Sequence, residues 1–171
     1  MMKNILLTIV ILLTTLNLYA KGTEHKMVVT DIDGNTLHIT GTKGGFVIDE
    51  YKGKAVFLEF FGHMCPPCMA TIPHYIKLTK EYKDKLKIVA IEAQSFDNDQ
   101  LKSFRDKKGI NYTLLSSEGA GEFYQYVAGR AGWRGAIPFL VATDTKGNVK
   151  FIRAGFIPEN ALKTLIGKIT N

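Results

Sequence analysis

The sequence Gly62-His63-Met64-Cys65-Pro66-Pro67-Cys68-Met69 decides the fold of this chain. It contains both cysteines of the protein, separated by two prolines. The apolar run of residues 55–61 before it has the length and composition of a buried strand. In residues 69 to about 83, which follow it, apolar side chains recur at helical intervals. The cysteine pair is therefore predicted at the point where a strand leads into a helix.

The predicted position of Cys65 favours a reactive thiolate. A thiolate is the nucleophile in disulfide exchange, and unpaired backbone N–H groups at a helix start stabilise negative charge. Cys65 lies at that start, so we expect it to attack, and Cys68, one turn further on, to resolve the mixed disulfide. Pro66 and Pro67 suit the first helical positions, where a missing N–H leaves no internal bond unmade. We expect the two prolines to tune the reduction potential, in a direction that the sequence leaves open.

The first twenty residues have the layout of a secretory signal peptide. Lys3 supplies a positive start, residues 5–13 are almost entirely apolar, and Ala20 is a small residue at the expected cleavage point. The alternative is an uncleaved anchor, although the apolar segment is short for a membrane span. We expect residues 1–20 to be a signal peptide and residues 21–171 to form one domain. The domain would be periplasmic, and held at the inner membrane only if the leader is retained.

Composition argues against two other classes of function, nucleic-acid binding and a purely structural disulfide. The chain has 171 residues, which is enough for one domain with a hydrophobic core. Its formal charge is +6, but its lysines are scattered, with no run longer than Lys107-Lys108, so a nucleic-acid-binding stripe is not expected. A disulfide that spans two intervening residues would constrain the unfolded chain little. A redox role for the cysteines is therefore favoured over a structural one.

The rest of the chain alternates between strand and helix patterns. Predicted strands occupy residues 27–30, 36–40, 86–93, 111–115, 138–143 and 149–153. Predicted helices occupy residues 97 or 98 to 108, 122–127, and a C-terminal segment that starts at 158. Residues 129–135, which are rich in glycine, are expected to be irregular. The pattern indicates a single α/β domain.

This order of elements resembles the thioredoxin fold. The resemblance is carried by Cys-x-x-Cys after a central strand, by Pro73 inside the next helix and by Ile137-Pro138 before the last hairpin, and it covers residue 26 to the C-terminus. The leader, the amino-terminal hairpin and the helix near residues 99–108 are most similar to the exported TlpA/ResA/CcmG-like branch. The resemblance implies a central mixed sheet flanked by helices, with an amino-terminal β-hairpin extension and an inserted helix.

The resemblance also implies roles for two residues outside the cysteine motif. In thioredoxin-like proteins the proline before the last hairpin is cis and packs beside the cysteines, which points to Pro138. Glu59, six residues before Cys65, matches a buried acid of thioredoxin. A carboxyl group in such surroundings has a raised pKa and would accept a proton from Cys68. The alternatives are an ordinary strand-edge proline and a glutamate that faces solvent or a lysine.

Five further residues either depart from the family pattern or need a role of their own. Met64 stands where many relatives have tryptophan, and Thr71 stands where ResA-like proteins often carry an acid. We expect His63 either to perturb the dithiol electrostatically or to be solvated beside it. His74 is predicted on the helix surface, and Trp133 is predicted to pack on the core.

The expected function is that of an exported thiol–disulfide oxidoreductase with a redox-active Cys65–Cys68 disulfide and no cofactor. TlpA/ResA/CcmG-like proteins mostly act as reductants, often in cytochrome c maturation. The resemblance therefore implies a reductase that a membrane electron-donor protein recharges and that acts on protein thiol or disulfide clients. The first alternative is an oxidase or isomerase that makes disulfides. The second is a metal-binding chaperone in which His63 and His74 join the cysteines, but His74 is predicted on a different helix face, so no metal is expected.

Overall fold

The computed structural model describes residues 24–170, so the predicted leader lies outside the described residues. The strands are β1 (His25–Thr30), β2 (Thr36–Gly41), β3 (Phe46–Ile48), β4 (Ala55–Phe61), β5 (Leu86–Glu92), β6 (Thr113–Ser116), β7 (Phe139–Thr143) and β8 (Val149–Ala154). The helices are α2 (Pro66–Glu81), α3 (Asn98–Lys108), α4 (Ser117–Ala131) and α5 (Glu159–Ile169), with a 3-10 turn η1 (Asp49–Tyr51). Within the described part, no helix combines the length and apolar character needed to cross a bilayer.

The strands form two sheets. The larger has five strands in the order β6-β5-β4-β7-β8, with β4 parallel to β5 and antiparallel to β7. This is the central mixed sheet that the resemblance to the thioredoxin fold implies. The smaller has the order β1-β2-β3 and contains the predicted hairpin, whose turn uses Gly34 at a φ of 86°. The amino-terminal extension is therefore a hairpin with one added strand.

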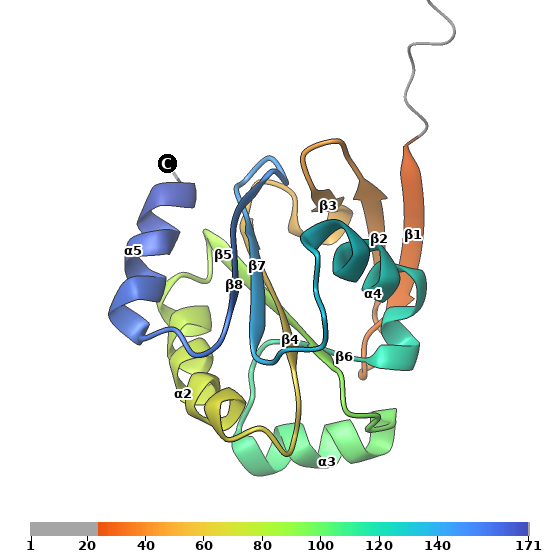
Figure 1. Cartoon of the computed structure of the whole chain (residues 1–171), viewed down its shortest axis with the longest axis vertical. Coiled ribbons are helices and arrows are strands. Elements are labelled where there is room, and N and C mark those ends of the chain that lie inside the picture. The colour runs from red at the N-terminus through yellow and green to blue at the C-terminus, as the bar shows by residue number, and fades with distance from the viewer. Residues whose placement is uncertain (1–23, 171) are drawn as a thin grey trace, which may run out of the picture.

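Helices and the small sheet cover the two faces of the large sheet (Figure 1). On one face α2 and α5 pack against apolar side chains of β4, β5 and β7. On the other face lie α4 and the three-stranded sheet, while α3 crosses one end. All seven residues of β4 are buried, because this strand is covered on both faces. The central position of β4 brings the residues that follow it to the end of the sheet.

Helix α3 confirms the predicted inserted helix and its ends. The Asp97 side chain accepts a hydrogen bond from the backbone N–H of Gln100, and the Gln100 side chain accepts one from the N–H of Asp97. These reciprocal bonds form a capping box. At the other end Gly109 adopts a left-handed conformation with a φ of 66°. Local sequence therefore determines both ends of this helix.

Helix α4 corrects the sequence prediction. The prediction had a short helix over 122–127 followed by irregular chain from 129, but α4 runs from Ser117 to Ala131. Its start is capped by Ser116, whose hydroxyl accepts a hydrogen bond from Gly119 N–H, and it kinks at Gly121. Phe123 and Val127 bury their side chains against the small sheet. This tertiary packing holds a glycine-rich segment in a helix that its propensity alone disfavours.

Candidate active site

Cys65 and Cys68 lie at the junction between β4 and α2, as predicted, and they form a disulfide. Cys65 is the N-cap of α2, with an extended backbone, and its Sγ accepts a hydrogen bond from Cys68 N–H at 3.3 Å. Pro66 and Pro67 occupy the first two helical positions. The helix start thus directs a backbone donor at the sulfur of Cys65, where a thiolate would develop.

The two cysteines differ in their exposure to solvent. Cys65 is 6% exposed and Cys68 is 1% exposed, so Cys65 is the nearer of the two to the surface. Met64, immediately before it, is 73% exposed. An approaching disulfide would therefore meet Cys65 first, in keeping with the predicted order of attack.

The Ile137–Pro138 peptide bond is cis, as predicted, and it immediately precedes β7. The Ile137 side chain packs against the same apolar cluster as both cysteines. A Cβ on Gly62 would lie 2.7 Å from Ile137 Cδ1, so glycine permits this close approach. The segment that carries Pro138 thus borders the loop that leads to Cys65.

Glu59 is buried in β4, which rules out the alternative of a glutamate that faces solvent. It is 4% exposed and lies opposite Ala90 in β5 and Leu140 in β7. Burial raises the pKa of Glu59 to about 8, although a hydrogen bond with the Tyr75 side chain acts in the opposite direction. Since Ala90 belongs to the apolar cluster that contains Cys68, Glu59 lies on the same side of the sheet as that cysteine.

A second buried acid, Glu92, was missed as a candidate. It ends β5, is 0% exposed, and accepts a hydrogen bond from His63 Nδ1 at 2.9 Å. The imidazole of His63 also stacks on the ring of Phe96, with centroids 3.6 Å apart. The solvated alternative for His63 is therefore wrong. An acid at the end of a largely apolar strand was the available signal.

Two other predicted positions can be compared with the structure. Trp133 stacks on Phe60 at 4.6 Å between centroids, which confirms its packing role. His74 is only half-buried on α2, but its Nδ1 is fully buried and without a hydrogen-bond partner. Within residues 24–170 no group of three or more His, Cys, Asp and Glu side chains is arranged to hold a metal ion.

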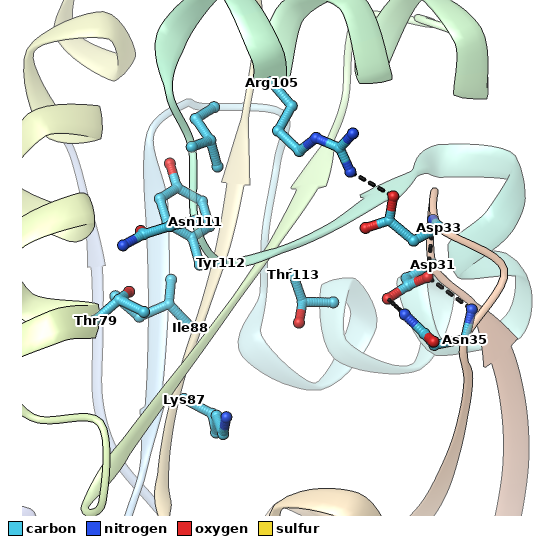
Figure 2. A pocket seen from close by; sticks show the side chains of 11 residues that line it. Asp31, Asp33, Asn35, Thr79, Lys87, Ile88, Arg105, Asn111, Tyr112 and Thr113 are labelled. Carbon is cyan, nitrogen blue, oxygen red and sulfur yellow. Dashed lines mark hydrogen bonds and ion pairs between the residues drawn. The ribbon is translucent and has the colours of Figure 1, made fainter.

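A polar pocket of about 440 Å³ lies elsewhere, between α3 and the β1–β2 turn (Figure 2). Arg105 reaches across it to form an ion pair with Asp33. The Asp31 carboxylate accepts hydrogen bonds from the N–H groups of Asp33 and Asn35, so it stabilises its own turn. None of the four predicted site residues lines the pocket. The side chains of Arg105, Asp33 and Asp31 already bind groups of the protein itself, and we assign the pocket no function.

Comparison with known families matches residues 29–152 to the AhpC/TSA family. The chain belongs to this family. Among curated relatives, the thiol-disulfide oxidoreductase ResA of Bacillus anthracis is 29% identical over 144 residues, which are 84% of this chain and 74% of the relative. ResA of Halalkalibacterium halodurans is 26% identical over 137 residues, which are 80% of this chain and 69% of that protein.

Solved structures show the same fold. A thiol:disulfide interchange protein of the thioredoxin family from Chlorobium tepidum superposes with a TM-score of 0.68 at 22% identity, covering 89% of this chain and 99% of that one. The exposed lipoprotein thioredoxin Etrx1 of Streptococcus pneumoniae gives a TM-score of 0.63 at 20% identity, covering 84% and 99%. The family, the ResA relatives and the Cys65–Cys68 pair together show that the chain is a thiol–disulfide oxidoreductase with a thioredoxin-like fold.

Proposed function

We propose that this oxidoreductase is an exported reductase of protein disulfides in which Cys65 attacks and Cys68 resolves. The observation that carries the proposal is the difference between the surroundings of the two cysteines. Cys65 is nearer to solvent and receives a backbone N–H at the helix start, whereas Cys68 lies one turn deeper. The names of the ResA relatives support thiol–disulfide exchange as the chemistry.

The reaction begins with the reduced pair. The Cys65 thiolate attacks one sulfur of a client disulfide, which forms a mixed disulfide and releases one client thiolate. The ionised form of Glu59, which is the minority form at neutral pH because its pKa is about 8, accepts the proton of Cys68. The Cys68 thiolate then attacks the Cys65 sulfur. The second client thiol then leaves, and the Cys65–Cys68 disulfide forms. Two electrons pass to the client, and a membrane electron-donor protein restores the dithiol.

The properties of Glu59 suit proton exchange with a thiol. Its pKa of about 8 is close to the ordinary value of a cysteine thiol, about 8.5, so a proton would move between them at little cost. An exposed glutamate would be too weak a base for this step. Pro138, in the cis peptide that borders the dithiol, would leave the adjacent backbone open to an extended client.

One pair of measurements tests the direction of electron flow. In a glutathione redox buffer we expect a potential near that of thioredoxin, about −270 mV, and far from the value of about −120 mV for a strong periplasmic oxidant. In cells, Cys68→Ser should accumulate mixed disulfides with a few clients, such as apocytochromes c, and Cys65→Ser should trap none. An oxidising potential together with many secreted clients would support the alternative of an oxidase or isomerase.

The proposal includes export by residues 1–20 and a single domain over residues 21–171. Mass spectrometry of the protein from its native host is expected to find Lys21 at the amino terminus, in a periplasmic or secreted fraction. A chain that retains its leader and sediments with membranes would instead support the anchor alternative.

A further inference from the structure

A buried acid lies beneath the loop that leads to the cysteines. Glu92 is completely buried at the end of β5, opposite Phe61, the last residue of β4. Cys65 follows Phe61 by four residues. A charge that is removed from water needs several hydrogen-bond donors to remain stable. The donors that surround Glu92 therefore indicate what the residue does.

Both oxygens of Glu92 accept hydrogen bonds from nitrogen. Oε2 accepts from the backbone N–H groups of Gln94, at 3.0 Å, and Phe96, at 2.9 Å. Oε1 faces His63, with Nδ1 at 2.9 Å and the backbone nitrogen at 3.4 Å. Three of these four partners are backbone donors, which suits a carboxylate because a carboxylate only accepts. We accordingly assign the hydrogen of the His63 ring to Nδ1.

These contacts fasten two loops together. The first is the dithiol loop, residues 62–64, and the second is the β5–α3 loop, residues 93–97. Besides the bonds of Glu92, the Gln94 side chain accepts a hydrogen bond from Met64 N–H at 2.8 Å. The stacked rings of His63 and Phe96 add a third connection. The residues that lead into Cys65 are therefore held from below by the end of β5.

The backbone of the β5–α3 loop shows how firmly it is held. Ser95 has a φ of 70°, a left-handed conformation that is unfavourable for a residue with a side chain. The residues on either side of it are those whose N–H groups bind Glu92. The buried carboxylate thus compensates for an unfavourable backbone next to the candidate active site.

The charge of Glu92 lies within about 10 Å of the backbone of Cys65. Its Oε1 is 3.4 Å from the backbone nitrogen of His63, and two residues of chain span at most about 7 Å. Glu92 and Cys65 are both buried. Charges in such surroundings are screened less than in water. The same charge contributes, after burial, to a raised pKa of Tyr124 on α4, so it acts beyond its direct partners.

We propose that Glu92 is a positioning residue that sets the redox equilibrium of the cysteine pair, an inference that rests on the proposed role of Cys65 and Cys68. A negative charge near Cys65 disfavours its thiolate and so favours the disulfide. The reduced protein then gives up its two electrons more readily. His63 donates to the carboxylate and partly neutralises it, so the two side chains act on the cysteines in opposite directions.

The test compares the thiol–disulfide equilibrium of the purified wild-type protein and two variants in glutathione buffers. Glu92→Gln keeps the shape of the side chain and removes its charge. It is expected to shift the equilibrium about tenfold toward the dithiol, which equals about 30 mV for a two-electron couple. His63→Phe keeps a ring on Phe96 but removes the donor, so it is expected to shift the equilibrium toward the disulfide.

Asp144 provides a matched control. Its carboxylate accepts hydrogen bonds from the N–H groups of Lys146 and Asn148, both at 2.9 Å, in the same i+2 and i+4 pattern as Glu92. It lies in the β7–β8 turn, at the end of β7 opposite to Pro138. Asp144→Asn is expected to lose stability while its redox equilibrium stays that of the wild type.

The outcomes separate the possible explanations. Opposite shifts in the two variants, with none in Asp144→Asn, support the proposal, because a loosened loop would shift both variants in the same direction. Shifts of the two variants in the same direction overturn the proposal. A Glu92→Gln equilibrium within threefold of the wild type also overturns it. If Glu92→Gln does not fold, an unchanged equilibrium in His63→Phe overturns it and a shift toward the disulfide supports it. A wild-type protein that does not exchange with glutathione would overturn the proposed function itself.

Discussion

Glu59 shows how one residue in the centre of a sheet couples stability to chemistry. Its carboxyl group is 4% exposed, and burial raises its pKa from 4.5 to about 8. The same burial, together with the carboxyl group, raises the pKa of Tyr75 well above its usual value. The protonated form of Glu59 therefore predominates at neutral pH, although an ordinary glutamate would be ionised there.

Glu59 should make the stability of the oxidised protein fall as pH rises from about 4.5 to about 8. Over this range the unfolded chain loses a proton that the folded chain retains, at a cost of at most about 1.4 kcal/mol per pH unit. Above about pH 8 the effect levels off. Glu59→Gln should remove the dependence, as measured by urea unfolding at pH 5 and pH 7.5. Glu118→Gln, at an exposed position, is the control and should keep the wild-type dependence.

Glu59→Gln should also slow the second step of the reaction. We expect the resolution of the mixed disulfide by Cys68 to fall about 100-fold, because the variant lacks the proton acceptor. Alkylation of Cys65 should stay at the wild-type rate. Single-turnover release of the two client thiols separates the steps. Equal slowing of both would show that Glu59 acts on the fold of the site and does not act on the proton of Cys68.

At the scale of elements, α3 and α4 show when local sequence determines a helix. The ends of α3 carry their own signals, which are the capping box at Asp97 and the left-handed Gly109. Helix α4 begins with a good cap at Ser116 but contains three glycines, at 119, 121 and 129. It depends on burying Phe123 and Val127, which are distant in sequence from their partners in the small sheet. Of these two helices, only α3 has ends that the sequence predicts correctly.

Asp97→Ala should therefore reduce the free energy of unfolding by about 1 kcal/mol, the usual cost of a lost N-cap. Asp99→Ala is the matched control, since Asp99 is also an exposed acid in the first turn of α3 but makes no capping bond. Asp99→Ala should reduce the free energy of unfolding by less than half as much as Asp97→Ala does. Urea unfolding of both variants measures the difference. Equal losses would mean that the attraction of acids to the helix start accounts for the effect, with no contribution from the cap.

At the scale of the whole molecule, a few backbone contacts join the small sheet to the large one. The N–H of Phe46 in β3 donates to Gly147 O at 3.0 Å, and Gly45 forms an isolated bridge with Asn148. Tyr126 of α4 donates from its hydroxyl to Gly45 O at 2.8 Å. The β7–β8 turn therefore serves as one attachment point for the amino-terminal extension.

Gly147→Ala should be unusually destabilising. Gly147 has a φ of 82°, and a Cβ there would collide with the Phe46 carbonyl and lie 2.6 Å from Val47 Cγ2. We expect a loss of about 3 kcal/mol or more, from the left-handed backbone and the overpacking together. Gly34→Ala is the control, since Gly34 has a φ of 86° with nothing within 4 Å, and it should cost about 1–2 kcal/mol. Thermal or urea unfolding compares them, and similar losses would argue against the close approach.

The sequence by itself determined the Cys-x-x-Cys pair at a strand-to-helix junction and the order of the strands and helices. Those features depend on residues that are neighbours in the chain, such as the cysteines, Pro66 and Pro67, or on the apolar patterns of single elements. The mixed arrangement of the central sheet, the cis bond at Pro138 and the acid at Glu59 came from the family resemblance.

Only the tertiary structure decided which polar residues meet beneath the dithiol. His63 and Glu92 are 29 residues apart, and they pair because parallel pairing of β4 and β5 places the ends of both strands together. The full extent of α4 was decided in the same way, by its contact with the small sheet. Contacts between distant segments depend on strand register and packing, and a single sequence carries no direct signal for either.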